Sequence, residues 1–140
     1  MKHFIAGTVL SLLMIAARAS ADVNWEQNYD AALQKAKKEQ KLVMVDMYTD
    51  WCGWCKRLDK DAYSNKDVTA KLSKEFVSVK INPEKSAQGA KLAKEFGTRG
   101  YPHIVFLDTA GKKFAEIPGY LPANEFLKRL NEVAEQAKKK

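Results

Sequence analysis

The residues most able to do chemistry lie in one short stretch that contains both cysteines of the chain, Trp51-Cys52-Gly53-Trp54-Cys55. Two thiols separated by two residues, close to alternating strand and helix patterns, indicate exchange between a dithiol and a disulfide. A purely structural bridge is a weaker interpretation, because a four-residue loop constrains the unfolded chain very little. Zinc binding is weaker still, since two thiolates and one distant histidine fall short of the usual four ligands. We therefore expect redox chemistry with no metal and no cofactor.

The two cysteines are expected to differ in role because of where each falls along the chain. Cys52 lies where an apolar run, residues 42–48, gives way to a helical pattern. Its sulfur can therefore face unpaired backbone N–H groups at the start of a helix, which favour the thiolate anion. Cys55 falls one turn later, inside the helix and less exposed. We predict that Cys52 attacks and Cys55 resolves, while Lys56 adds nearby positive charge or is simply solvated.

A single carboxylate, Asp46, interrupts the apolar run that precedes the cysteines. Apolar residues stand on both sides of it, and an unpaired carboxylate is costly to bury. One interpretation places Asp46 at a strand edge, exposed or bonded to a backbone amide. The other makes it a buried acid that takes or gives the proton of Cys55 when this thiol releases a mixed disulfide. We favour the second.

The surrounding pattern predicts the elements that must hold these groups in place. Asn24 with Gln27 predicts the capped start of a helix that runs to about residue 40. Further helical spacing is found at 54–62 and 64–76, at 86–96 and after Pro122, and strands are expected at 42–48, 76–81, 103–107 and 113–117. The order helix, strand, helix, strand, helix, strand, strand, helix predicts an α/β fold around a mixed sheet with a terminal hairpin.

The first residues are expected to be separate from this fold. A short basic start is followed by an apolar stretch and by Ala19-Ser20-Ala21, which is the order of a secretory signal peptide. A retained membrane anchor is the rival interpretation, but the apolar stretch of 14 residues is shorter than the roughly 20 that a bilayer span needs. We expect residues 1–21 to be removed and residues 22–140 to form one domain.

Charge and length restrict the partners. The net charge is +7, and the lysines are spread along helical stretches rather than gathered in one patch. Nucleic-acid binding needs a clustered basic patch with interleaved aromatic residues or a recognisable module, and the sequence has neither. A chain of 140 residues is long enough for one domain with a proper core. We expect a monomer that does not bind nucleic acid.

Together these motifs resemble the thioredoxin family. The resemblance covers residues from about 24 to 136, and it is carried by Asp46, residues 51–56, residues 80–82, residues 99–102 and Gly119. The stretch 76–80 is most similar to exported thioredoxin-like domains, such as the C-terminal domain of the thiol reductant conductor DsbD. The resemblance implies a thioredoxin fold. Because the family's short opening strand is not evident here, we expect a central sheet of four strands flanked by helices.

The resemblance also implies roles for residues whose side-chain chemistry alone does not indicate a function. Pro102 would be a cis-proline that packs against the cysteine pair and presents the backbone of Tyr101 to a substrate. Asp46 and Lys80 would be the family's buried acid and its neighbouring lysine. Gly119 would lie on the rim of the substrate groove, and Trp51 beside the reactive sulfur.

Two positions depart from the family pattern. The dipeptide between the cysteines is Gly53-Trp54 rather than the common Gly-Pro, and in the family this dipeptide is a main control of the reduction potential. His103 follows the presumed cis-proline in place of the common threonine, and it either tunes Cys52, senses pH or simply occupies the end of a strand.

Four aromatic residues allow two arrangements around the cysteines. They form an apolar collar around the sulfurs, or the two tryptophans pack into the core, as the place of Trp54 on a helical stripe with Leu58 and Ala62 allows. The residues concerned are Trp51, Trp54, Tyr101 and Tyr120.

The function that we predict is reduction of disulfides in partner proteins by an exported, periplasmic thiol:disulfide oxidoreductase. Because an oxidising compartment offers no reducing pool, re-reduction would come from a membrane thiol donor of the DsbD type, as the resemblance implies. One alternative keeps the fold but donates or isomerises disulfides. Another, of a different class, is a non-catalytic binding or chaperone module that uses the groove beside the cis-proline.

Overall fold

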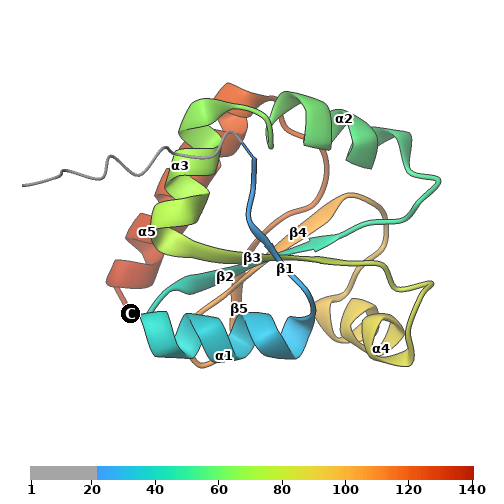
Figure 1. Cartoon of the computed structure of the whole chain (residues 1–140), viewed down its shortest axis with the longest axis horizontal. Coiled ribbons are helices and arrows are strands. Elements are labelled where there is room, and N and C mark those ends of the chain that lie inside the picture. The colour runs from blue at the N-terminus through green and yellow to red at the C-terminus, as the bar shows by residue number, and fades with distance from the viewer. Residues whose placement is uncertain (1–21) are drawn as a thin grey trace, which may run out of the picture.

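The structure is a computed structural model that describes residues 22–140, so the predicted signal peptide at 1–21 lies outside the described residues. The chain folds into a sheet of five strands with helices on both faces (Figure 1). In chain order the elements are β1 (Trp25–Glu26), α1 (Tyr29–Glu39), β2 (Leu42–Met47), α2 (Gly53–Asp61), α3 (Lys66–Glu75), β3 (Phe76–Ile81), α4 (Ala87–Phe96), β4 (His103–Leu107), β5 (Lys113–Ile117) and α5 (Ala123–Lys138). No helix in this part of the chain is long and apolar enough to cross a membrane.

The sheet is mixed, and β2 lies at its centre. Its strand order is β1-β3-β2-β4-β5, with β1 and β2 parallel to β3 and with β4 antiparallel to both β2 and β5. The unbroken apolar sequence of β2 agrees with this place, because a central strand is covered on both faces. Successive side chains of β2 alternate between the two faces of the sheet, so Met44 and Asp46 share one face and Val43 and Val45 share the other.

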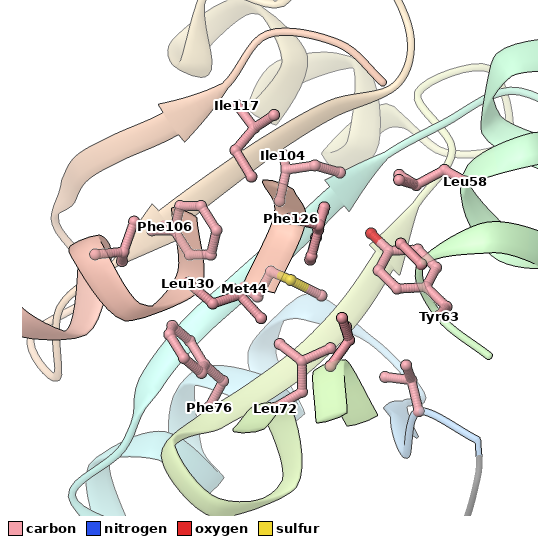
Figure 2. Packing of buried hydrophobic residues seen from close by; sticks show 14 of the residues in the cluster. Met44, Leu58, Tyr63, Leu72, Phe76, Ile104, Phe106, Ile117, Phe126 and Leu130 are labelled. Carbon is pink, nitrogen blue, oxygen red and sulfur yellow. The ribbon is translucent and has the colours of Figure 1, made fainter. Parts of the chain in front are cut away.

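Each face of the sheet is covered by its own set of helices (Figure 1). Helices α1 and α4 cover the face of Val43 and Val45, where Ala32, Leu92 and Phe96 are buried. Helices α2, α3 and α5 cover the face of Met44 and Asp46. The larger side chains packed there are shown in Figure 2, and they are Leu58, Tyr63, Leu72, Phe76, Ile104, Phe106, Ile117, Phe126 and Leu130.

The prediction of four strands is wrong, because a fifth strand opens the sheet. β1 contains only Trp25 and Glu26, which pair in parallel with Ser78 and Val79 at the edge of β3. A two-residue strand is too short to produce a recognisable alternation in the sequence. The family's opening strand is therefore present.

The predicted start of the first helix is also wrong, by several residues. Helix α1 begins at Tyr29, and the side chain of Asn28 accepts a hydrogen bond from the Ala31 N–H at 2.8 Å. Asn28 competes with Asn24 for the same capping role, and the strand pairing of Trp25 excludes a helix there. The ring of Trp25 instead packs edge-on against Tyr63, with ring centres 5.0 Å apart.

The other predicted elements are present, with small shifts at their ends. Ser86 caps α4, which agrees with the predicted stretch 86–96, and Gly97 ends this helix in the left-handed region at φ 70°. Asn65, rather than Ser64, caps α3. Helix α5 follows Pro122 as predicted; Phe126, Leu130 and Val133 are buried on it, and Ala137 is partly buried.

Candidate active site

Cys52 caps the N-terminus of helix α2. It is the residue immediately before the helix, and its Sγ accepts a hydrogen bond from the Cys55 backbone N–H at 3.0 Å. The positive end of the helix dipole therefore acts directly on this sulfur, which favours the thiolate over the thiol. Cys52 and Cys55 are joined in a disulfide, with their Cα atoms 5.3 Å apart. One sulfur thus lies at the helix start, and the other lies within its first turn.

The two cysteines differ less in exposure than the sequence predicts. Cys52 is 5% exposed and Cys55 is 3% exposed. The order is the expected one, but the difference is too small to separate an attacking thiol from a resolving thiol. The assignment rests instead on the hydrogen bond from the helix to the sulfur of Cys52.

Asp46 lies on the central strand and is 1% exposed, so the strand-edge interpretation is wrong. No donor in the described part of the chain makes a well-aligned hydrogen bond to either carboxylate oxygen. Burial raises the pKa of Asp46 above its ordinary value, while the Lys80 ammonium and the Tyr63 hydroxyl oppose this rise without cancelling it. A carboxyl in this state can hold and release a proton at a higher pH than an exposed aspartate.

Lys80 connects this acid to helix α2. Its Nζ lies 3.4 Å from Asp46 Oδ2 and 2.7 Å from Oδ1 of Asp59, which is one turn beyond Cys55 on α2. Burial alone would lower the pKa of Lys80, but these two carboxylates outweigh it, so the pKa is raised and the lysine stays charged. Because Asp59 holds the ammonium more closely, Asp46 is left only partly neutralised.

Aromatic rings surround the ammonium of Lys80. The rings of Trp25, Tyr48 and Tyr63 have their centres 4.8–5.5 Å from Nζ. Such contacts stabilise a cation that has lost part of its water. Lys80 is therefore fixed in place by both charge and packing.

Trp51, the residue before Cys52, pairs with Tyr101 in what we call the aromatic rim. Trp51 is 69% exposed, its indole N–H donates to the carboxylate of Glu84, and its ring lies edge-on to that of Tyr101 at 6.0 Å. The peptide bond between Tyr101 and Pro102 is cis, as the resemblance implies. The exposed ring of Trp51 therefore contacts Tyr101, the residue that precedes the cis-proline.

Trp54, which lies between the two cysteines in the sequence, pairs with Tyr120 in the same aromatic rim. Trp54 is 55% exposed, so packing of the two tryptophans into the core is the wrong interpretation. Its ring lies 5.2 Å from that of Tyr120, and the guanidinium of Arg57 lies 5.6 Å from both. The Tyr120 hydroxyl donates to Asp61 on α2, which fixes the loop containing Gly119 against this helix.

Three predicted residues have few contacts. Lys56 is exposed and forms no ion pair within residues 22–140. A side chain added at Gly53 or at Gly119 would meet nothing within 4 Å, so both glycines leave open space. No group of three or more potential metal ligands occurs in the described part of the chain.

A helix-capping cysteine pair, a buried acid with its lysine and a cis-proline occur together on a five-stranded sheet. The sequence profile of the thioredoxin-like domain matches residues 29–134, which is most of the chain. The chain belongs to the thioredoxin-like family. With Cys52 and Cys55 in contact, this thioredoxin-like protein is a thiol:disulfide oxidoreductase.

Sequence relatives place the chain near DsbD within the thioredoxin-like proteins. It is 33% identical over 123 residues to the thiol:disulfide interchange protein DsbD of Actinobacillus pleuropneumoniae serotype 5b, in a match that covers 81% of this chain and 21% of that protein. It is also 36% identical over 102 residues to DsbD of Yersinia enterocolitica, in a match that covers 71% of this chain and 17% of that protein. The chain thus spans about a fifth of the length of these relatives, and the resemblance to DsbD seen in the motifs is confirmed.

Solved structures agree with the thioredoxin-like family and its fold. A putative disulphide-isomerase from Bacteroides thetaiotaomicron is 30% identical, with a TM-score of 0.72, over 81% of this chain and 94% of that one. The reduced C-terminal domain of DsbD from Neisseria meningitidis is 24% identical, with a TM-score of 0.62, over 74% of this chain and 91% of that one. The second likeness shows the thioredoxin fold alone.

Several contacts of this thioredoxin-like site were not predicted from the sequence. Among the residues that bond or stack against the predicted ones are Asp59, Tyr63, Glu84 and Arg57. The position of Asp59 could have been predicted to face the site, because it follows Cys55 by four residues and residues four apart share a helix face. No sequence pattern predicts the contact of Glu84 with Trp51, since it joins two loops that are distant in sequence.

We predict that Trp51→Ala raises the KM for a protein disulfide about tenfold, because exposed aromatic anchors contribute strongly at interfaces. The free energy of unfolding should change by less than about 1 kcal/mol, since the side chain is mostly exposed. Both are measured by steady-state disulfide reduction and by urea unfolding. Trp51→Phe, which keeps a ring but loses the bond to Glu84, should have an intermediate KM. An unchanged KM for Trp51→Ala would exclude this tryptophan from partner binding.

Proposed function

We propose that this protein is an exported reductase of protein disulfides. The observation that carries the proposal is the hydrogen bond from the Cys55 N–H to the sulfur of Cys52 at the N-terminus of α2. This bond supports Cys52 as the sulfur that is held as a thiolate in the reduced protein. The buried acid and lysine behind it are of the kind that a resolving thiol needs in order to lose its proton.

The reaction has two exchange steps. The Cys52 thiolate attacks one sulfur of a partner disulfide, forming a mixed disulfide and releasing the other partner sulfur as a thiolate. Cys55 then gives its proton towards Asp46 and attacks Cys52. The Cys52–Cys55 disulfide forms, and the second partner sulfur leaves. Two electrons pass to the partner, and its two thiolates take up one proton from Cys55 by way of Asp46 and one from the solvent.

Re-reduction of the oxidised pair requires an external donor. The order of residues 1–21 supports export, and an oxidising compartment holds no reducing pool. A membrane thiol reductant of the DsbD type is a suitable donor, since sequence similarity to DsbD supports a place in such an exchange chain. The periplasm of a bacterium is the compartment where this arrangement is needed.

The exposed aromatic rim supports proteins as substrates. Trp51 and Trp54 immediately precede Cys52 and Cys55 in the sequence, and they are the large apolar side chains most exposed in the described chain. Such a surface fits a polypeptide that lies across the sulfurs, whereas a small thiol needs no surface of this kind.

Trapping on a Cys55→Ala variant tests the proposal. Without the resolving thiol, the mixed disulfide between Cys52 and its partner persists, and we expect partner proteins to be recovered from the periplasm and released by a reducing agent. Cys52→Ser with Cys55→Ala is the matched control and should trap nothing. If Cys55→Ala captures no protein covalently, while the intact chain still binds partners, the non-catalytic binding module is the better account.

A further inference from the structure

His103 occupies a position that the exchange reaction does not explain. It is buried at the start of β4, immediately after the cis peptide bond. Because side chains alternate along a strand, His103 shares the face of Val105 and Leu107, which pack with α1 and α4. Asp46 and the α2 side of the sheet lie on the opposite face. An effect of His103 on the cysteines must therefore pass through the loop that precedes it.

Both ring nitrogens of His103 are bonded. Nε2 lies 2.7 Å from Glu116 Oε2 on β5, and Nδ1 lies 2.9 Å from the Thr98 hydroxyl at the start of the loop. Because a carboxylate only accepts, Nε2 carries a proton, and in the neutral ring Nδ1 accepts the hydrogen of Thr98. The side chain of His103 thus joins the first residue of the loop to a neighbouring strand.

Lys113 joins the same Glu116 carboxylate to the end of helix α4. Its Nζ lies 2.6 Å from the same Glu116 oxygen and donates to the backbone carbonyl of Phe96, the last residue of α4, at 2.9 Å. The Lys113 ammonium and the bond to His103 lower the pKa of Glu116, which keeps it charged. The end of α4, the start of the loop and the start of β4 are therefore all tied to β5.

The loop itself has few other restraints. The Thr98 N–H donates to Ala93 O at 2.8 Å, but residues 99–102 form no backbone–backbone hydrogen bond within the described chain. The N–H and C=O groups of residues 99–101 and the C=O of Pro102, which has no N–H, therefore have no backbone partner, and they can bond a partner's backbone provided that the loop keeps one conformation. Side-chain bonds at its two ends must supply this order.

We propose that Thr98, His103, Lys113 and Glu116 form a loop clasp that positions the backbone of Tyr101 and Pro102 for partner binding. All four are positioning residues, since none lies on the cysteine side of the sheet. The proposal rests on the proposed reductase function, because it concerns the groove that the protein substrate would occupy. Its effect falls on binding rather than on chemistry: an unclasped loop samples several conformations, and only one of them fits a partner.

A matched set of threonine variants tests the loop clasp. Thr98→Val keeps the shape of the side chain but removes the hydroxyl, and Thr98→Ser keeps the hydroxyl. We expect Thr98→Val to raise the KM for a protein disulfide about fivefold, as expected for the loss of one hydrogen bond, with kcat within about twofold. Thr98→Ser should restore the KM. Thr109→Val, at an exposed threonine in the β4–β5 turn, controls for the substitution itself.

Glu116→Ala provides a second and independent break of the loop clasp. It removes the partner of both His103 and Lys113 from a half-exposed position, and it should raise the KM in the same way. If both variants are folded and retain the KM of the unmodified protein, the loop clasp does not position the groove and the proposal fails. Failure of the reductase function itself looks different, because the unmodified protein would then reduce no protein disulfide.

Discussion

Cys52→Ser is expected to abolish the reduction of protein disulfides, with a fall in rate of at least about a thousandfold, as for the loss of a covalent nucleophile. The serine hydroxyl stays protonated at neutral pH, and it cannot form the mixed disulfide through which exchange proceeds. The fold should survive, because the serine oxygen can still accept the N–H of Cys55 and cap α2. The rate is measured with a protein disulfide and an excess of dithiol donor.

Cys55→Ser is the informative companion to Cys52→Ser. It should still attack a partner once, giving a stoichiometric burst of mixed disulfide followed by slow turnover, because Cys52 retains its place at the helix start. If Cys52→Ser keeps turnover and Cys55→Ser loses the burst, the two roles are reversed. The hydrogen bond to Cys52 would then be a structural cap only.

Asp46→Asn is expected to slow turnover by about a hundredfold, in the range typical for a positioned acid or base. The defect should fall on the second exchange step, because an amide cannot accept the proton of Cys55. The mixed disulfide should therefore accumulate. Rapid quenching at low pH, followed by separation of the mixed disulfide, measures both steps. Equal slowing of the two steps would exclude a specific role in proton transfer to or from Cys55.

The same variant should be more stable than the unmodified protein at pH 8. Burial raises the pKa of Asp46 in the folded state above its ordinary value of 3.8. Its contribution to stability is therefore fully present below that ordinary value and is lost as the pH rises through the raised, folded-state pKa. Asparagine has no such loss, and Lys80 keeps Asp59 as its partner.

We expect the free energy of unfolding of Asp46→Asn to exceed that of the unmodified protein at pH 8 by about 1–3 kcal/mol, the cost of an unsatisfied buried polar group. The difference should shrink towards zero as the pH falls to the ordinary carboxyl range. Asp59→Asn is the control at an exposed carboxylate, and it should show no comparable gain. A variant that is less stable than the unmodified protein at pH 8 would mean that Lys80 fully compensates the charge of Asp46.

The sequence predicts the centre of this fold better than its edges. The strand around Asp46 and the helix after Cys52 follow from a long apolar run and a helical stripe, both of which are local patterns. The two-residue β1 has no local pattern, and it exists only because β3 offers an edge to pair with. The start of α1 was misplaced because Asn24 with Gln27 matches a capping box, and only the pairing of Trp25 with β3 excludes a helix there.

The candidate site divides in the same way. The roles of Cys52 and Cys55 depend on helix geometry, which spacing encodes, whereas the contacts of Trp51 with Glu84 and of His103 with Thr98 and Glu116 join different elements. No periodicity records such contacts. The exposure of the two tryptophans could not be predicted from the sequence either. The helical stripe that includes Trp54 does not indicate which end of the stripe extends beyond the core.

The reduction potential of the Cys52–Cys55 couple tests the central claim most directly. It is measured by equilibrating the protein with dithiothreitol or glutathione mixtures of known potential and by separating the oxidised and reduced forms. Reductase function predicts a value near that of thioredoxin, about −270 mV. A value near that of the oxidant DsbA, about −120 mV, would contradict it and would show that this site donates disulfides instead.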